Sequence, residues 1–439
     1  MARISVFGIG YVGVVAAACL ARDGHEVIAV DIDPSKVDAI NSGQSPIVEN
    51  GLPELIAPSV MSGKLRATTD ADEAIQNTDA SFVCVGTPSA PDGSVGTIYV
   101  KSVCETIGAA LAGKSGFHAV IIRSTIVPGS TEQVAVRALE TMSGKVAGRD
   151  FGVGYFPEFL RESTAIKDYD DPGLIVVGAM DQVTGDFLEK LNAHLPCEVH
   201  RVDIPTAEMV KYTSNTWRAV KVSFANEIGN VAKAAGLDGQ QVMRILCSDH
   251  KVNMSPYFMR PGFAFGGSCL PKDVRALRQF AGAHDVDVPI LDAVLQANAA
   301  QIARARTMVA EAGAKSVGMI GISFKPGTDD LRESPLATLA AQLIEDGVSI
   351  SVYDPYVHAA YAQELSGAGR GNDVVPDLGD RLVEGVDELI DGSDGIIVGN
   401  FYKTTVKQIL SAAEQKPVID LTRVSQTRTS QGHYSGICW

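Results

Sequence analysis

The feature that most constrains this sequence is a glycine pattern directly after an apolar run at its start. Gly8, Gly10 and Gly13 stand between that run and a stretch of small residues that is typical of a helix. In such a pattern the first glycine permits a tight turn, the second lets the backbone approach a pyrophosphate, and the third lets the helix pack closely against the strand. The helix N-terminus then faces the phosphates. The pattern predicts a strand–turn–helix unit that binds a dinucleotide.

A carboxylate at the end of the next apolar run refines this prediction. Residues 26–30 predict a second strand, and Asp31 follows it. An acidic side chain at that place accepts hydrogen bonds from the adenosine ribose and repels a 2′-phosphate, so we expect NAD rather than NADP. Lys36 follows shortly after, near the expected adenosine end, but a solvated helix lysine explains it equally well.

Length and charge exclude several classes of protein. The chain has 439 residues, which suggests about three domains. Its formal net charge of −15 disfavours nucleic-acid binding, which needs a basic surface. The apolar residues 14–21 follow the glycines and predict a helix of the first domain rather than a signal peptide. No apolar run approaches the ~18 residues of a transmembrane helix, so we expect a cytoplasmic protein with no membrane or nucleic-acid partner.

The cysteines indicate a reducing compartment and no metal. There are 7 of them, an odd number, and no Cys-x-x-Cys occurs, so the pattern does not suit a disulfide framework. Cys247 and His250 have the spacing of a metal-ligand pair, but no second pair lies near them in the sequence. We therefore expect no metal site.

Strands and helical segments alternate through the first half of the chain. Strands are predicted at residues 3–8, 26–30, 81–85 and 119–122. This alternation is typical of a parallel, doubly wound sheet, in which ligands bind beyond the carboxyl ends of the strands. Thr87 and Thr125 follow two of these strands, so we expect them at the functional edge of the sheet.

The pattern changes twice further along the chain. Long helical patterns at residues 206–235 and 289–311 predict an all-α middle domain. An α/β pattern then returns, with a helix predicted at residues 334–347 and strands at 317–324, 349–353, 394–398 and 417–421. Asp354 ends one of these strands as Asp31 does, but the glycine pattern is missing. The predicted fold class is α/β, with an N-terminal Rossmann doubly wound domain, a central all-α domain and a C-terminal Rossmann-like α/β domain.

A cysteine in a glycine-rich segment is the main candidate for covalent chemistry. Cys269 follows Gly266 and Gly267 and precedes Lys272 and Asp273. Glycines let the backbone approach a ligand closely, and a nearby cation favours the nucleophilic thiolate. A free cysteine is more often a small buried apolar residue. Beside a redox cofactor, however, a nucleophilic thiol is suited to oxidising an aldehyde to an acid.

Polar side chains share one face of the long helix predicted from residue 206. Lys211 and Asn215 are one turn apart, and Arg218, Val222 and Asn226 continue the face. Because this helix is otherwise rich in Val, Ala and Phe, we expect the polar groups in a buried setting, where Lys211 and Asn215 would stabilise an oxyanion. The alternative is a solvated stripe opposite a core stripe.

Other candidates lie in loops. Glu158 and Glu162 share one loop, and Glu162 is the candidate to activate a water as a general base; as surface carboxylates both would carry no function. Arg260, Lys325 and Arg332 lie beside glycine, proline or aromatic residues and are candidates for binding phosphate or carboxylate. Nearby aromatic residues either stack on a base or sugar or simply pack, namely Tyr257, Phe258, Phe263 and Phe265.

Together these motifs resemble the nucleotide-sugar 6-dehydrogenase family, which includes the UDP-glucose and GDP-mannose dehydrogenases. The resemblance covers essentially the whole chain and rests on residues 8–13, 85–88, 123–125, 157–163, 211–215, 266–273 and 324–334. A closer likeness to the GDP-mannose branch rests on residues 215–233, 257–273 and 436–439. Two positions depart from the pattern: Phe156 stands where many relatives have Asn, and Arg218 where the GDP-mannose branch has His.

The resemblance implies a four-electron oxidation of a sugar C6 alcohol to a carboxylate by two NAD⁺, through a cysteine thiohemiacetal and thioester and without a metal. It implies GDP-mannose as the substrate and GDP-mannuronate, a precursor of uronic-acid polysaccharides such as alginate, as the product. It also implies a homodimer or higher homo-oligomer with shared active sites. Residues 1–203 would form the NAD-binding Rossmann domain, residues 204–300 the central helical dimerisation domain, and residues 301–439 the C-terminal nucleotide-sugar-binding domain.

The resemblance also implies roles for single residues. Cys269 matches the nucleophile, Lys211 and Asn215 the oxyanion-stabilising pair, Glu162 the hydrolytic base, and Asp273 a helper carboxylate. Cofactor contacts are implied for Gly8, Gly10, Tyr11, Val12, Gly13, Asp31, Lys36, Thr87, Thr125, Lys272 and Arg332. Substrate contacts are implied for Glu162, Lys211, Asn215, Arg218, Asn226, Tyr257, Arg260, Phe263, Gly266 and Lys325. Thr125 is implied as catalytic as well.

Three other functions stay open at this point. A UDP-sugar 6-dehydrogenase, acting on UDP-glucose or UDP-N-acetylmannosamine, would use the same residues. A two-electron hydroxyacid dehydrogenase of the 6-phosphogluconate type needs neither a nucleophilic thiol nor a third α/β domain. A non-catalytic NAD-binding regulator would lack part of the constellation, whereas Thr125, Lys211, Asn215 and Cys269 are all present.

Overall fold

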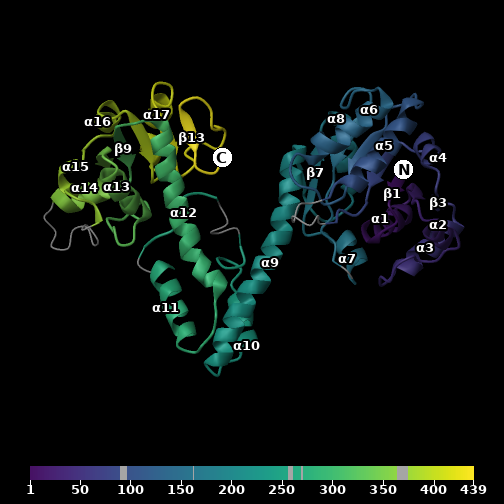
Figure 1. Ribbon diagram of the computed structural model, residues 1–439, viewed down its shortest axis with the longest axis horizontal. Helices are drawn as coiled ribbons and strands as arrows, with labels where there is room; N and C mark the ends of the chain where they lie inside the picture. Colours follow the sequence, from purple (N-terminus) through teal and green to yellow (C-terminus); the bar gives the residue numbers. More distant parts are fainter. Residues whose placement is uncertain (89–95, 162, 256–260, 268–269, 363–373) are drawn as a thin grey trace. The chain divides into compact units, whose positions relative to one another are not determined.

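The computed structural model describes residues 1–88, 96–161, 163–255, 261–267, 270–362 and 374–439 (Figure 1). Within these ranges the chain divides into two compact units, Met1–Val220 and Lys221–Trp439. The long helix α9, Ile204–Ala234, contributes residues to both units.

The first unit is built on an eight-stranded sheet with the order β3-β2-β1-β4-β5-β6-β7-β8. Its strands are β1 Arg3–Phe7, β2 Glu26–Val30, β3 Leu65–Thr68, β4 Ala80–Val83, β5 Ala119–Ile122, β6 Gly152–Tyr155, β7 Ile175–Ala179 and β8 Val199–Val202. All neighbours pair in parallel except β6 and β7, which are antiparallel. The strand order reverses between β1 and β4, and ligands of such sheets bind at that point. The predicted doubly wound fold is confirmed.

Helices cover both faces of this sheet (Figure 1). They are α1 Tyr11–Arg22, α2 Pro34–Asn41, α3 Leu52–Met61, α4 Ala71–Gln76, α5 Ile98–Ala112, a π-helical turn Thr131–Val136, α6 Arg137–Ser143, α7 Ala165–Asp170 and α8 Gln182–Asn192. Ile4 and Val6 of β1 pack in one apolar core with α1, while Phe7 packs in the other with α5. Because both faces are buried, the inner strands are continuous apolar runs, which made them visible in the sequence.

The sequence analysis missed four strands of this sheet, of which β7 is the apolar run Ile-Val-Val-Gly-Ala, while the other three are short and carry polar residues or glycine. β3 has the sequence Leu-Arg-Ala-Thr, β6 Gly-Val-Gly-Tyr and β8 Val-His-Arg-Val. Such segments lack the apolar run of an inner strand and form only because neighbouring strands offer hydrogen-bonding partners.

The middle of the chain is helical, as predicted. α9 is followed by α10 Gly239–Cys247, α11 Leu270–Gly282 and α12 Pro289–Ala312. Glu227 of α9 accepts hydrogen bonds from the backbone N–H groups of Ile290 and Leu291 at 2.7 and 3.3 Å. These groups have no partner within their own helix, so the buried carboxylate both caps α12 and joins it to α9.

A five-stranded parallel sheet with the order β10-β9-β11-β12-β13 forms the rest of the second unit. Its strands are β9 Ser316–Ile320, β10 Ser349–Tyr353, β11 Gly395–Val398, β12 Val418–Asp420 and β13 Tyr434–Gly436. Its helices are α13 Pro335–Glu345, α14 Pro355–Ala362, α15 Leu378–Arg381, α16 Val386–Asp391, a 3-10 turn Lys403–Thr405 and α17 Val406–Ala412. The predicted return to α/β structure is confirmed.

The two sheets share local details, which explains the internal likeness in the sequence. In the first, Gly8 has φ +94° and Asp31 accepts a hydrogen bond from Ile9 N at 2.7 Å. In the second, Gly321 has φ +87° and Asp354 accepts one from Ile322 N at 3.0 Å. In both, a carboxylate after the second strand holds the turn after the first.

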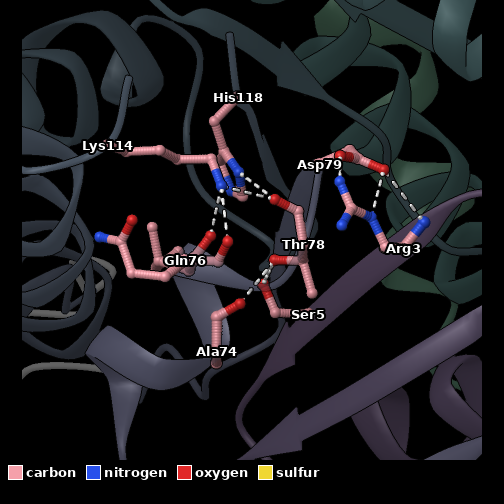
Figure 2. A network of polar contacts seen from close by, with 9 residues as sticks. Arg3, Ser5, Ala74, Gln76, Thr78, Asp79, Lys114 and His118 are labelled. Atoms are coloured by element: carbon pink, nitrogen blue, oxygen red, sulfur yellow. Dashed lines mark hydrogen bonds and ion pairs between the residues drawn. The ribbon is translucent and has the colours of Figure 1, made fainter. Parts of the chain in front are cut away.

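A buried polar network lies near the amino ends of β1, β4 and β5 (Figure 2). The hydroxyls of Ser5 and Ser81 are 2.7 Å apart, and Ser81 Oγ lies 2.7 Å from His118 Nε2. His118 Nδ1 lies 3.1 Å from the carbonyl oxygen of Thr78, which also accepts from Lys114 Nζ at 2.8 Å. Since a carbonyl only accepts, Nδ1 carries the proton and Nε2 accepts from Ser81.

The imidazole of His118 should therefore make stability depend on pH. Burial, and next the charge of Lys114, lower the pKa of His118 to about 3, while an unfolded histidine has a pKa of about 6.5. Between about pH 6.5 and pH 3, the histidine of the unfolded chain is protonated, whereas His118 of the folded chain stays neutral. Stability is thus complete above about pH 6.5 and falls toward pH 3, by up to about 1.4 kcal/mol per pH unit.

His118→Gln tests this dependence, because the amide can donate to Thr78 and accept from Ser81 without titrating. We expect urea unfolding of this variant to show a flatter loss of stability between about pH 6 and pH 4 than the wild type. The exposed His200→Gln is the matched control and should keep the wild-type slope. Equal slopes in wild type and His118→Gln would show that the network does not hold a neutral ring.

Candidate cofactor site and active site

The turn after β1 has the geometry that the glycine pattern predicts. A Cβ on Gly13 would lie 1.9 Å from the carbonyl oxygen of Gly8, so only glycine fits where α1 meets the strand. Gly8 itself has φ +94°, which L side chains rarely adopt. A Cβ on Gly10 or Gly86 would meet nothing within 4 Å, so both glycines border open space. No described side chain caps α1, whose first N–H groups therefore face that space.

One cavity lies on the side of this turn that Asp31 occupies. It has a volume of about 470 Å³ and is lined by Phe7, Gly8, Gly10, Val30, Asp31, Ile32, Asp33, Lys36, Thr69, Ala71, Cys84, Val85, Gly86, Tyr99, Ser102, Val103 and Thr106. Asp31 accepts from Ile9 N at 2.7 Å and from Asp33 N at 3.0 Å. Lys36 Nζ lies 3.4 Å from the Asp31 carboxylate and lines the same cavity.

A second cavity lies against the same turn. It has a volume of about 290 Å³ and is lined by Gly10, Tyr11, Val12, Cys84, Val85, Gly86, Thr87, Arg123, Ser124, Thr125 and Glu158. The two threonines expected at the functional edge both border it, and Thr87 Oγ1 donates to the carbonyl oxygen of Thr125 at 2.8 Å. The two cavities share Gly10, Cys84, Val85 and Gly86, so an elongated ligand that crosses the turn would occupy both.

A buried ion pair joins α9 to the edge of the second cavity. Lys211 is 3% exposed, and its Nζ donates to Glu158 twice, to the carbonyl oxygen at 2.6 Å and to Oε1 at 2.9 Å. One turn earlier, Glu208 accepts from Gly129 N at 2.5 Å and from Thr131 N at 2.8 Å. The Lys211 contacts hold α9 against the segment that follows β6, and the Glu208 contacts hold it against the segment that follows β5, which contains Thr125.

The rest of the predicted polar face on α9 is not buried. Asn215, Arg218 and Asn226 are exposed, so the expected buried setting is wrong for these three and right for Lys211. The physical reason is that α9 spans both units, so that beyond Lys211 the sheet no longer covers it. Arg218 keeps one contact, a hydrogen bond of 3.3 Å to the carbonyl oxygen of Phe159.

In the second unit, the described part of the glycine-rich segment packs against the segment after β9. A Cβ on Gly266 would lie 2.2 Å from the carbonyl oxygen of Glu333, and a Cβ on Gly267 would lie 2.8 Å from the ring of Phe324. Phe263 packs against the apolar core of the second sheet. Residues 261–267 and 324–335 are far apart in the sequence, but these contacts show that they pack against each other.

The cations expected in this unit border the same segments. Lys325 Nζ lies 5.2 Å from the ring centroid of Phe324, and Arg332 forms an ion pair of 2.7 Å with Asp330. Lys272 and Asp273 are exposed in the first turn of α11 and pair at 3.2 Å. Five further candidates, Glu162, Tyr257, Phe258, Arg260 and Cys269, lie outside the described residues.

Sequence reasoning missed the contacts of three carboxylates around the site, of which Glu208 and Glu49 are buried and Glu158 is partly buried. It named Glu158 without a role and did not single out Glu208 or Glu49, which is 6% exposed. The sequence near an acidic residue in a loop or helix does not indicate whether it is buried, because its hydrogen-bonding partners are far away in the sequence. In the part of the chain that the structure describes, no three His, Cys, Asp or Glu side chains could together hold a metal ion.

A dinucleotide cradle beside a buried Lys–Glu pair defines a dehydrogenase that uses a nicotinamide cofactor. Residues 2–196 match the NAD binding domain of the UDP-glucose/GDP-mannose dehydrogenase family, residues 205–300 its central domain and residues 318–427 its UDP binding domain. The chain belongs to this family and is an NAD-dependent nucleotide-sugar dehydrogenase.

Relatives with known names agree along the full chain. It is 50% identical to a GDP-mannose 6-dehydrogenase of Pseudomonas syringae and 47% identical to one of Azotobacter vinelandii, covering 100% of both chains in each case. It is 38% identical to a UDP-glucose 6-dehydrogenase of Haloferax volcanii over 80% of this chain and 83% of the other. The crystal structure of a ternary complex of GDP-mannose dehydrogenase from Pseudomonas aeruginosa matches with a TM-score of 0.96 at 46% identity, covering 100% of both chains. Within the described ranges, no helix is long and apolar enough to cross a membrane.

Proposed function

We propose that the protein oxidises the C6 alcohol of GDP-mannose to the carboxylate, giving GDP-mannuronate. One alcohol, two NAD⁺ and one water become one carboxylic acid, two NADH and two protons. The observation that carries the proposal is the full-length identity of 50% to a GDP-mannose 6-dehydrogenase, against 38% over part of the chain to a UDP-glucose enzyme. The two-electron hydroxyacid dehydrogenase is disfavoured, because the second α/β sheet is present.

The residues of the first unit suit the cofactor. The adenosine half fits the cavity beside Asp31, where the carboxylate that holds the glycine turn can also accept from ribose hydroxyls. The pyrophosphate would cross above Gly10, where a Cβ would fill open space, and face the uncapped start of α1. The nicotinamide half fits the cavity lined by Thr87 and Thr125. When bound, NAD⁺ supplies the hydride acceptor for both oxidations.

Cys269 is proposed as the nucleophile between the two oxidations. Its thiolate adds to the C6 aldehyde, and the carbonyl electron pair moves to oxygen to give a thiohemiacetal. Loss of hydride from C6 then leaves a thioester. Water, deprotonated by Glu162, attacks the acyl carbon, and the C–S bond breaks to return the thiolate and release the acid. Asp273 is proposed as a helper carboxylate close to these groups.

Lys211 is proposed to stabilise the developing oxyanion, together with Asn215. An ammonium group has three donors, and two of those on Lys211 already serve Glu158. The third remains for a substrate oxygen, and its direction is set because the other two are held. The ion pair with Glu158 thus aims the donor and keeps the buried charge compensated.

The second unit is proposed to bind the nucleotide sugar, and the middle helices to form a dimer. Gly266, Phe263 and Lys325 lie on adjoining segments, with Lys325 available for a phosphate. Arg218, Asn226, Tyr257 and Arg260 are proposed as further contacts. No described residue of α10 is buried, and its apolar Ile245 is 66% exposed, which is typical of a surface that another subunit covers. A cytoplasmic location is part of the same proposal.

The substrate is tested by offering GDP-mannose, UDP-glucose and UDP-N-acetylmannosamine side by side and measuring NADH formation. We expect kcat/KM for GDP-mannose to exceed that for UDP-glucose by at least about tenfold, which corresponds to about 1.4 kcal/mol of transition-state binding. A comparable or higher value with a UDP-sugar would overturn the substrate and favour the UDP-sugar alternative, while leaving the family unchanged.

A further inference from the structure

One buried carboxylate outside the residues discussed so far contacts two parts of the site. Glu49 lies in the loop before α3 and is 6% exposed. Its Oε2 accepts from the Tyr11 hydroxyl at 2.5 Å and from Ser163 N at 2.8 Å, and its Oε1 accepts from Ala165 N at 3.0 Å. Three donors from two distant segments therefore converge on one side chain.

The first segment is the glycine turn. Tyr11 directly follows Gly10, opens α1 and lines the cavity proposed for the nicotinamide half. Its hydroxyl also lies 3.4 Å from the carbonyl oxygen of Arg161. A change in the turn that moved Tyr11 would thus pull on both Glu49 and Arg161.

The second segment carries the proposed general base. Glu162 lies outside the described residues, but both of its neighbours are described, and both contact this group of side chains. Ser163 has φ +71°, an uncommon conformation for a residue other than glycine, which persists only where the surroundings hold it. Asn50 adds a hydrogen bond of 3.2 Å to the carbonyl oxygen of Ser163.

Only an ionised carboxylate satisfies these three donors. Burial by itself would raise the pKa of Glu49, but the hydrogen bonds from Tyr11, Ala165 and Ser163 outweigh it and lower the pKa. A glutamine would replace one acceptor by an N–H group, which would then face another N–H. The side chain is thus matched to joining the two segments, not merely to filling space.

We propose that Glu49 is a positioning residue that joins the cofactor turn to the loop carrying Glu158 and Glu162. The proposal rests on the proposed function, since it assigns the second loop to thioester hydrolysis. Binding of the cofactor against Tyr11 then steadies the loop, so the hydrolytic base is in place when the cofactor site is filled.

Three measurements on Glu49→Gln test the proposal: hydrogen exchange, steady-state kinetics and intact mass. Hydrogen exchange should speed up at the amides of Ser163 and Ala165 and stay unchanged in the inner strands of the sheet. With GDP-mannose and NAD⁺, kcat should fall by about 10-fold to 100-fold, because the base is misplaced. The KM for GDP-mannose should change less than about threefold. Intact-mass spectra during turnover should show more covalent acyl adduct than in the wild type. Glu54→Gln, which changes an exposed glutamate in the next helix, is the matched control and should change none of these measurements.

Tyr11→Phe tests the contact of Glu49 with the cofactor turn separately from its contacts with Ser163 and Ala165. It keeps the bonds from Ser163 and Ala165 to Glu49 and removes the hydroxyl by which the cofactor turn contacts Glu49 and the carbonyl oxygen of Arg161. In the wild type, NAD⁺ alone should slow exchange at these two amides, and in Tyr11→Phe this effect should be lost. This variant also serves if Glu49→Gln does not fold.

The following results would contradict the proposed role of Glu49. A folded Glu49→Gln with wild-type exchange at Ser163 and Ala165, or with kcat within about twofold of the wild type, would overturn the proposal. If Glu49→Gln does not fold, a Tyr11→Phe variant in which NAD⁺ still protects these amides overturns it as well. If wild-type protein oxidised no nucleotide sugar, the proposed function would fail, while exchange with NAD⁺ would still decide whether Glu49 joins the segments.

Discussion

Cys269→Ala is expected to lose net formation of the sugar acid by more than about a thousandfold, the size seen when a catalytic nucleophile is removed. If Cys269 forms the proposed thiohemiacetal, the second hydride leaves from a sulfur adduct, so without the thiol the reaction stops at the aldehyde. The first oxidation needs no thiol, and trace interconversion of alcohol and aldehyde should survive.

The measurement is the ratio of NADH to sugar acid, with mass spectrometry for the covalent adduct. The wild type should give two NADH per acid, and a thiol alkylator should abolish this, with protection by bound substrate. Cys269→Ser should stall, since a hydroxyl is the weaker nucleophile at neutral pH, and an ester adduct should then be visible. Cys197→Ala, which removes a partly exposed free cysteine away from the proposed site and dimer surface, is the control and should keep full activity. Near wild-type acid formation by Cys269→Ala would show that no covalent intermediate forms.

Lys211→Met is expected to lower kcat by about 10²-fold to 10³-fold, the effect of removing one donor to an oxyanion. It should also destabilise the fold by about 3–5 kcal/mol, because the carboxylate of Glu158 loses its buried counter-charge. The side chains of Lys211 and Glu158 are only 4% and 13% exposed, so water would compensate little of this loss.

The double variant Lys211→Met with Glu158→Gln separates these two effects. Urea unfolding should show that much of the stability returns, since no unpaired charge remains. The rate of acid formation should stay low, because the donor is still missing. Lys101→Met is the control, since its pair with Glu105 is exposed and should contribute at most about 1 kcal/mol. Recovery of both stability and kcat in the double variant would show that Lys211 has only a structural role.

Structural features that depend only on residues close together in the sequence could be predicted from the sequence. β5 and β10 have the predicted bounds, because a buried parallel strand is a continuous apolar run in the sequence. The glycine turn and Asp31 could be placed because the required backbone conformations and close approaches restrict which residues fit. The predicted roles of Cys269 and Glu162 stay predictions, since neither residue lies in the described part of the chain.

The sequence by itself therefore determined the class of fold, the cofactor turn and the face of α9 that carries Lys211. Tertiary structure alone decided which polar groups are buried and what they contact. Lys211 meets Glu158 across 53 residues of sequence, and Glu49 meets Ala165 across 116. It also decided that Asn215, on the same face as Lys211, is exposed. The physical reason is that spacing along a helix sets which side chains share a face, whereas burial depends on what packs against that face.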